Sequence, residues 1–237
     1  MTLTACAKRE PAGAAALASQ METMEWRAPD CEPADDCTSV TVDREVFSDR
    51  PALNEAVRLQ LLEQLQGNGE TTVAADTSLA QVAQAFIEDA GKVADISSAR
   101  WQMTGDAKAL ARRGNLLTVQ ITSYVYSGGA HGMPVTRWLN WDLSENRRVV
   151  LEDVIKSGAE GKFWSLAQAA HQQWLETQNA QQDFRENWPF ARSEDFRFTD
   201  KGLVLRYGVY TLGPYSMGEV ELLIPREQLV EVVREDF

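Results

Sequence analysis

The chain has 237 residues, of which 44% are hydrophobic and 24% are charged, a composition typical of a folded globular protein. Its 23 basic and 35 acidic residues give a net charge of −12, and no basic run is longer than two residues. These features argue against binding to nucleic acid or to anionic lipid, and favour attraction to a cationic partner. No apolar run approaches the roughly 20 residues that cross a bilayer, so membrane contact is expected only through a lipid anchor.

The first residues resemble the end of a bacterial lipoprotein signal. Leu3-Thr4-Ala5-Cys6 fits the pattern in which the cysteine is lipidated after cleavage. We expect residues 1–6 to be the remnant of such a signal, with its charged and apolar regions missing. A chance match of this short pattern is the alternative. Because Ala7 rather than aspartate follows the cysteine, we expect an exported protein anchored at the periplasmic face of the outer membrane, if the organism has two membranes.

Residues 7–37 are expected to form a tether followed by a disulfide-closed turn. The stretch after Cys6 is rich in alanine and poor in large apolar residues at regular spacing. Once Cys6 carries lipid, Cys31 and Cys37 remain as an even pair, which in an exported protein indicates a disulfide. A zinc site is not expected, because no CxxC and no paired histidines accompany these cysteines.

A strand and two helices are predicted next. Alternating valines indicate a strand over 39–47. A helix begins with the proline at 51 and runs to about 66, where a glycine ends it. The second helix covers about 79–91 and is capped by Ser78, which forms a capping box with Gln81.

After these helices, the residue pattern becomes typical of β-strands. Strands are predicted over 100–112, 116–126 and 135–143, joined by the turn RRGN and by a glycine-rich loop. In the second of these, apolar and polar residues alternate, which indicates a strand with one buried face.

The last third combines helices with short strands. In order, we expect a helical turn at 151–155, a long helix over about 160–178, a hairpin of 196–198 with 203–207, a strand over 220–224 and a helix from Pro225 to near Arg234. Helices and hairpins are segregated rather than alternating, which predicts an α+β fold with an antiparallel sheet and helices packed on it. We expect a single globular unit that allows two sub-domains, an N-terminal α/β part over 38–110 and a C-terminal α+β part over 111–237.

The sequence offers little for catalysis. Ser216 lies in GPYSMG, which misses the G-x-S-x-G nucleophile spacing by one residue. The two histidines, His131 and His171, have no metal-site spacing, and His171 falls at the edge of an apolar helix stripe, where a structural role is expected. We therefore predict no enzyme, no catalytic residue, no metal and no cofactor. The alternative is a cell-wall hydrolase or deacetylase that uses His131.

Two glycine-broken loops with tyrosines, YSGGAHG and YTLGPYSMG, are the candidate binding elements. Such loops present aromatic side chains on a rigid scaffold. The candidate ligand-binding residues are Tyr126, Gly128, Gly129, His131, Tyr210, Pro214, Tyr215 and Ser216. In the alternative interpretation, the glycines only permit a tight corner and His131 bonds locally. The sequence does not decide whether the two loops converge.

Several motifs occur in a characteristic order: YSGGAHG at 126–132, WLNWDL at 138–143, LEDVI at 151–155, FRFTDKGL at 196–203 and PYSMG at 214–218, followed by Ile-Pro at 224–225. From about residue 38 to the C-terminus, this order resembles the extracellular domain of RsiV-type anti-sigma factors, known as domain of unknown function 3298, with its N-terminal companion domain. The resemblance implies an α+β fold outside the cytoplasmic membrane.

The best-understood member of that family senses lysozyme by binding it, and the same domain accompanies peptidoglycan deacetylases as a non-catalytic module. This chain departs from both arrangements, because it has no transmembrane, sigma-binding or deacetylase segment. The resemblance therefore implies a binding role rather than regulation of a sigma factor. We expect a non-catalytic cell-envelope lipoprotein whose ligand is lysozyme, another cationic envelope-active protein, or peptidoglycan.

Overall fold

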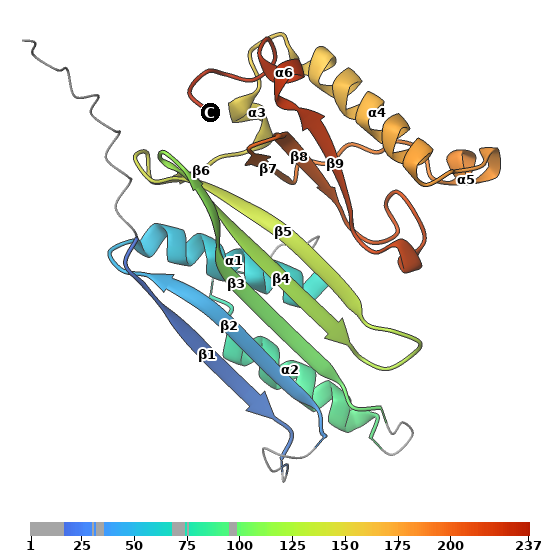
Figure 1. The fold of residues 1–237 in the computed structure, drawn as a ribbon. Helices are drawn as coiled ribbons and strands as arrows, with labels where there is room; N and C mark the ends of the chain where they lie inside the picture. Colours follow the sequence, from blue (N-terminus) through green and yellow to red (C-terminus); the bar gives the residue numbers. More distant parts are fainter. Residues whose placement is uncertain (1–16, 30, 32–35, 68–73, 75, 95–98) are drawn as a thin grey trace, which may run out of the picture.

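The computed structural model describes residues 17–29, 31, 36–67, 74, 76–94 and 99–237, and Cys6 lies outside these ranges. The fold is α+β, as predicted, with a large and a small sheet that each carry helices (Figure 1). The large sheet follows chain order and consists of β1 (Ser19–Arg27), β2 (Ser39–Phe47), β3 (Gln102–Arg113), β4 (Leu116–Tyr126), β5 (Met133–Asp142) and β6 (Arg147–Arg148).

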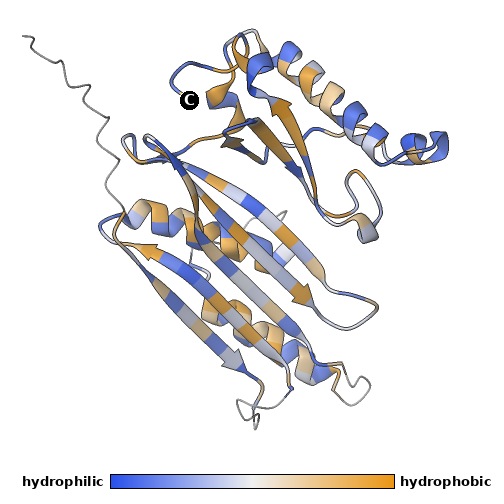
Figure 2. Cartoon of the chain, in the orientation of Figure 1, coloured by the Kyte–Doolittle hydropathy of each residue, from blue (hydrophilic) through white to orange (hydrophobic). Residues whose placement is uncertain are grey.

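Two helices, α1 (Pro51–Gly67) and α2 (Leu79–Lys92), cover one face of the large sheet (Figure 1). The predicted capping box is present: the Gln81 backbone N–H donates to Ser78 Oγ, and the Ser78 backbone N–H donates to Gln81 Oε1. Bands of apolar and polar residues alternate along the central strands (Figure 2), and the apolar residues form a core with the helices. Burial of this alternating face against α1 and α2 holds the first sub-domain together.

Three features of the large sheet differ from the prediction. The segment expected to be a tether contains β1, which pairs antiparallel with β2 along its whole length. The pairing of β2 with β3 is parallel, because α1 and α2 lie between them in sequence and form the crossover that parallel strands require. The expected boundary between residues 110 and 111 falls inside β3, and the sheet continues across it through the β3–β4 hairpin.

Cys31 and Cys37 are joined by a disulfide, as predicted. It lies in the connection between β1 and β2, whose ends are paired from Arg27 to Ser39. The Arg27 guanidinium also donates a hydrogen bond to Cys37 Sγ at 3.7 Å. The disulfide therefore closes the turn of a hairpin and is part of the folded unit.

The small sub-domain has an antiparallel sheet in the order β7-β8-β9. Its elements are α3 (Leu151–Val154), α4 (Glu160–Thr177), α5 (Gln182–Asn187), β7 (Phe196–Thr199), β8 (Gly202–Tyr207), the 3-10 turn η1 (Tyr215–Met217), β9 (Val220–Pro225) and α6 (Arg226–Leu229). It has its own buried core, to which α4 contributes Phe163 and Ala167. Helix α5 was not predicted. The closing helix is shorter than expected, because residues after α6 form backbone bonds with the α3 segment: Lys156 N–H donates to Val232 O and Arg234 N–H to Val154 O.

The small sub-domain seals the outer edge of β5. The backbone N–H groups of Thr136 and Trp138 donate to the carboxylates of Glu219 (2.6 Å) and Asp195 (2.8 Å), and the Asn140 side chain donates to Phe196 O at 2.7 Å. An edge strand exposes unpaired backbone groups that other chains can bind, and here carboxylates of the second sub-domain accept from two of these N–H groups. The two sub-domains are therefore joined by directed polar contacts.

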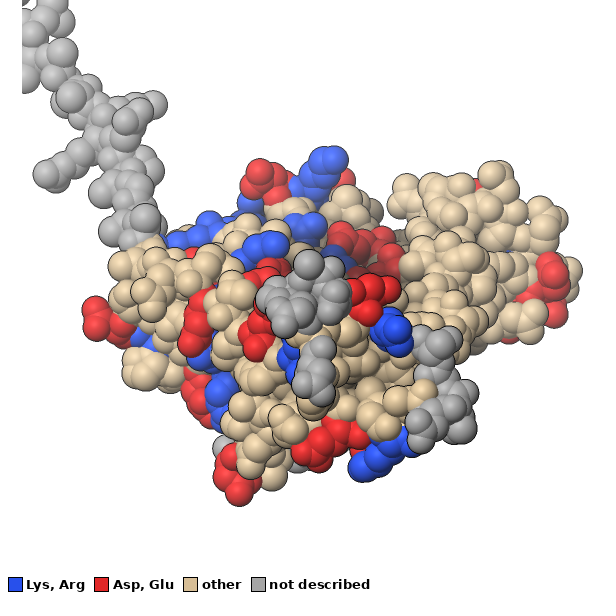
Figure 3. Space-filling view, turned by 90° about the horizontal axis from the view of Figure 1, so that it is seen from below, with Lys and Arg blue, Asp and Glu red and all other residues tan. Residues whose placement is uncertain are grey.

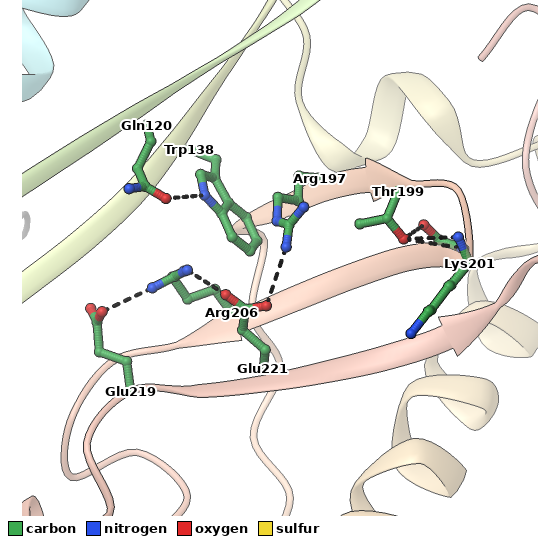
Figure 4. A network of polar contacts seen from close by, with 9 residues as sticks. Gln120, Trp138, Arg197, Thr199, Lys201, Arg206, Glu219 and Glu221 are labelled. Carbon is green, nitrogen blue, oxygen red and sulfur yellow. Dashed lines mark hydrogen bonds and ion pairs between the residues drawn. The ribbon is translucent and has the colours of Figure 1, made fainter. Parts of the chain in front are cut away.

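A cation–π stack reinforces this junction (Figure 4). The guanidinium carbons of Arg206 and Arg197 lie 4.4 and 4.8 Å from the centroid of the Trp138 ring. Arg206 also forms an ion pair with Glu219 at 2.9 Å and a second with Glu221. Because Arg206 and Glu219 are largely buried, these contacts are screened less by salt than surface pairs.

Candidate functional site

Three glycines, Gly128, Gly129 and Gly132, were expected to set the backbone of the β4–β5 loop, and two of them do so through positive φ; at Gly132, a side chain would clash with the Tyr124 ring. Gly128 and Gly129 have φ values of +93° and +95°, which non-glycine residues adopt only with strain. The Tyr126 hydroxyl donates a hydrogen bond to Gly129 O at 3.2 Å, across the loop. The predicted residues of this loop therefore form one locally bonded unit.

The two predicted loops converge. The hydroxyl of Tyr215, from η1 before β9, donates to Gly132 O at 2.8 Å, although the residues are 83 positions apart. The rings of Tyr215 and His131 are stacked, with centroids 3.7 Å apart and planes at 18°. A tyrosine of the small sub-domain thus anchors the loop of the large sheet.

His131 bonds through both ring nitrogens. Nδ1 lies 3.1 Å from Gly132 O and Nε2 lies 3.2 Å from the Tyr210 hydroxyl. A carbonyl oxygen can only accept, so the network assigns the proton of a neutral ring to Nδ1, and Nε2 accepts from Tyr210. His131 therefore shapes the loop cluster, which we define as His131, Tyr210 and Tyr215.

Tyr210 has a strained backbone within this cluster. Its φ is +63°, in the left-handed region, and its side chain is 48% exposed. Its ring centroid lies 5.7 Å from that of Tyr215 and 6.4 Å from that of His131. An exposed aromatic held at a cost of about 1 kcal/mol or more in backbone strain is typical of a functional position.

The other predicted residues lie in the same loops with other roles. Pro214 precedes η1 and its carbonyl accepts from Met217 N–H at 2.9 Å. Ser216 is exposed, and within the described ranges no hydrogen bond joins it or Ser127 to His131. The loops thus form an aromatic surface in which no serine is bonded to a base.

The second histidine is structural, as expected. His171 lies on α4, is 1% exposed, and packs against the rings of Trp174 and Phe190. Burial lowers the pKa of its imidazole, and the charge of Arg185 lowers it further. Considering only described residues, no group of three or more His, Cys, Asp or Glu side chains is arranged to hold a metal ion.

A feature that the sequence did not reveal lies beside the loops, at the junction of the sub-domains. Asp195 is 8% exposed; its Oδ1 accepts from Trp138 N–H, whereas its Oδ2 is buried and has no partner among the described residues. Burial raises its pKa from 3.8 to about 7, although the Trp138 N–H bond and the charges of Arg137 and Arg206 favour the ionised form. No signal in the sequence marks this residue, because its burial depends on docking to β5.

Two hollows flank this carboxylate. The first has a volume of about 210 Å³ and lies between α1, the edge of β5 and the residues before β7; Gln60, Gln64 and Asn140 line it. The second has a volume of about 420 Å³ and extends along the start of β5 to Tyr207 and Thr211. Arg137, Glu194 and Asp195 line both.

The molecule has no continuous charged face on the side seen in Figure 3. Acidic and basic side chains are interspersed over the larger part of this view, and an area poor in charge lies toward the side of the β4–β5 loop and η1 in Figure 1. Aromatic residues with few charges are typical of the centre of a protein interface. Within the described ranges, no helix is both long and apolar enough to span a membrane.

These features define a class: an α+β protein of two sub-domains, sealed along one strand edge, with an aromatic loop cluster where they meet. The chain contains a domain of the family described as "Protein of unknown function (DUF3298)", matched over residues 152–227. These residues correspond to the small sub-domain from α3 to the start of α6. No curated protein matches the chain.

Two solved structures are similar over nearly the whole chain. A DUF3298 family protein from Pseudomonas aeruginosa PAO1 is 29% identical and has a TM-score of 0.77, with 94% of this chain and 96% of that one covered. A DUF3298 member from Bacteroides fragilis NCTC 9343 is 20% identical and has a TM-score of 0.67, with coverages of 92% and 95%. The second similarity concerns the fold alone. Both similarities extend well beyond residues 152–227, so they include the region of the large sheet.

Proposed function

We propose that this chain is a non-catalytic lipoprotein of the cell envelope, lipidated at Cys6, whose loop cluster binds lysozyme or another cationic envelope-active protein. The observation that carries the proposal is the cluster of His131, Tyr210 and Tyr215, where two loops from different sub-domains meet; His131 and Tyr210 are exposed and Tyr215 is half-buried. Interface hot spots are enriched in tyrosine and lie on rigid supports. The resemblance to RsiV-type domains supports lysozyme as the ligand.

The charge balance supports the same class of ligand. The chain carries a net charge of −12, and opposite net charges accelerate association with a basic protein. The disulfide between Cys31 and Cys37 supports a location in an oxidising compartment outside the cytoplasm, where the protein would encounter lysozyme and peptidoglycan. The strained Tyr210 supports a binding role for the cluster, because strain at an exposed aromatic does not stabilise the fold.

Titration calorimetry with a c-type lysozyme at low ionic strength tests the proposal. We expect Tyr215→Ala to weaken binding by on the order of 2 kcal/mol, about thirtyfold in dissociation constant. Glu145→Ala is the control, because Glu145 is exposed in the turn at the opposite end of β5 from His131. It should change mainly the salt-dependent association rate.

The absence of binding heat with verified folded protein would refute lysozyme as the ligand. Sedimentation with purified peptidoglycan sacculi, weakened by Tyr215→Ala, would identify peptidoglycan instead. Turnover of a muropeptide that is lost in His131→Ala would replace the binding role with the hydrolase or deacetylase alternative.

A further inference from the structure

Buried acceptors without partners line the first hollow at the junction. Gln60, Gln64 and Asp195 are 5%, 1% and 8% exposed, and each has one side-chain oxygen with no hydrogen-bond partner among the described residues. Gln64 Nε2 donates to Ile121 O at 3.4 Å, which assigns Oε1 as the atom left free. An unpaired buried polar atom is costly, so these three oxygens favour a bound hydrogen-bond donor once Asp195 is ionised.

The same hollow contains charges of both signs that do not pair. Glu63, Glu194, Arg137 and Arg148 line it, and the structure gives none of these four side chains an ion pair or hydrogen bond within the described part of the chain. Unpaired charges of both signs around one hollow are suited to a ligand that carries both signs itself.

We propose that the junction beside Asp195 is a binding site for a small zwitterion, an amino acid or the free end of a short peptide. The ligand's ammonium group donates to Asp195 Oδ2 and to the free oxygens of Gln60 and Gln64. The ligand's carboxylate pairs with Arg137, because a planar guanidinium can bind both oxygens of a carboxylate in bidentate fashion. The second hollow, which shares Arg137 and Asp195, takes the side chain or the next residue; its volume of about 420 Å³ lies in the usual range for small-molecule sites.

The first hollow is lined by α1, the edge of β5 and the residues around the start of β7, and does not include the loops of the proposed protein-binding cluster. The second hollow reaches Val209 and Thr211, which flank Tyr210, but His131, Tyr210 and Tyr215 do not line it. A protein without affinity for lysozyme can therefore still bind the zwitterion. The two proposals stand or fall independently.

Calorimetry and thermal shift on the full chain at about pH 8, where the Asp195 carboxyl is mostly ionised, test the site. The probes are the common amino acids of both hands and glycylglycine, and for each amino acid that binds, its amide and its deaminated acid, which keep one charge each. We expect at least one zwitterion to bind and to raise Tm, and its one-charge analogues to bind about tenfold more weakly or worse, because each lacks a charge-assisted hydrogen bond.

Two variants locate the binding. Asp195→Asn and Arg137→Gln should each weaken it about tenfold, and Asp195→Asn keeps the acceptor for Trp138 N–H, so it is expected to fold. Lys201→Gln, in the exposed β7–β8 turn, is the matched control and should bind normally. The proposal is overturned if no zwitterion binds, if one-charge analogues bind equally well, if both variants bind normally, or if a crystal soaked with the best binder holds only water in the hollows.

Discussion

The buried carboxylate of Asp195 makes the stability of this protein depend on pH in an unusual direction. Its pKa is raised from 3.8 to about 7 in the folded state, mainly by burial. Between these values the folded protein binds a proton that the unfolded chain has lost. Stability therefore falls as the pH rises from about 4 to about 7, by about 1.4 kcal/mol per pH unit, and changes little above that range through this residue.

Asp195→Asn isolates this contribution. The amide stays neutral at every pH, and its oxygen can still accept the Trp138 N–H that Asp195 Oδ1 accepts at 2.8 Å. The variant should resemble the protonated wild type, so the two proteins should have similar stabilities near pH 4. A pKa difference of about 3 units predicts that the variant is more stable above pH 7 by up to about 4 kcal/mol.

Urea unfolding of both proteins across this pH range measures the difference directly. The effect of His171, whose pKa burial lowers, is present in both proteins and cancels. The control is Asp142→Asn. Burial opposes ionisation of Asp142, but hydrogen bonds from Ser144 and Glu145 hold its pKa below the usual range.

Because the pKa of Asp142 is low, its stabilisation is complete above about pH 4 and is lost only in more acid solution. Asp142→Asn should therefore lower stability by a constant amount from about pH 5 to about pH 8. A difference between wild type and Asp195→Asn that does not change with pH would refute the burial of an ionisable carboxylate at the junction.

Four further predictions concern the N-terminal segment and the loops. Mass spectrometry of the native full-length protein should find a lipid on Cys6, and an unmodified thiol would end that proposal. Replacing Cys31 and Cys37 by serine should cost about 2 kcal/mol in chemical unfolding, because the disulfide closes a short loop between β1 and β2, and an unchanged midpoint would show that it does not constrain the fold. Gly128→Ala should destabilise the protein by about 1–2 kcal/mol because φ is +93°, and an unchanged stability would show that the loop does not need this backbone conformation. Tyr215→Phe should cost about 1 kcal/mol because it loses the bond to Gly132 O, and an unchanged stability would show that this bond does not anchor the loop.

The sequence by itself determined most of the secondary structure, because local periodicity and local capping specify it. The alternation of Leu117, Val119 and Ile121 placed β4, since residues on one face of a strand recur at every second position. The Ser78–Gln81 capping box began α2. The pair of Cys31 and Cys37 was predictable from their number and spacing.

Elements stabilised by distant partners were missed or altered. Strand β1 has few apolar residues and lies at the edge of the sheet, so its pairing with β2 rather than its own pattern makes it a strand. Helix α6 ends early because the residues after it form backbone hydrogen bonds with the α3 segment, and no local sequence pattern predicts these long-range bonds.

The site shows the same division. Glycines and tyrosines marked both loops in the sequence, but only the docking of the small sub-domain onto β5 places Tyr215 on His131, 84 residues away in the chain. Asp195 stands in a polar segment that is indistinguishable from a solvated loop, and its burial arises only when that segment covers the edge of β5. Local patterns determine how a segment folds, whereas pKa shifts, hollows and aromatic clusters depend on which distant surfaces meet, and only the tertiary structure decides that.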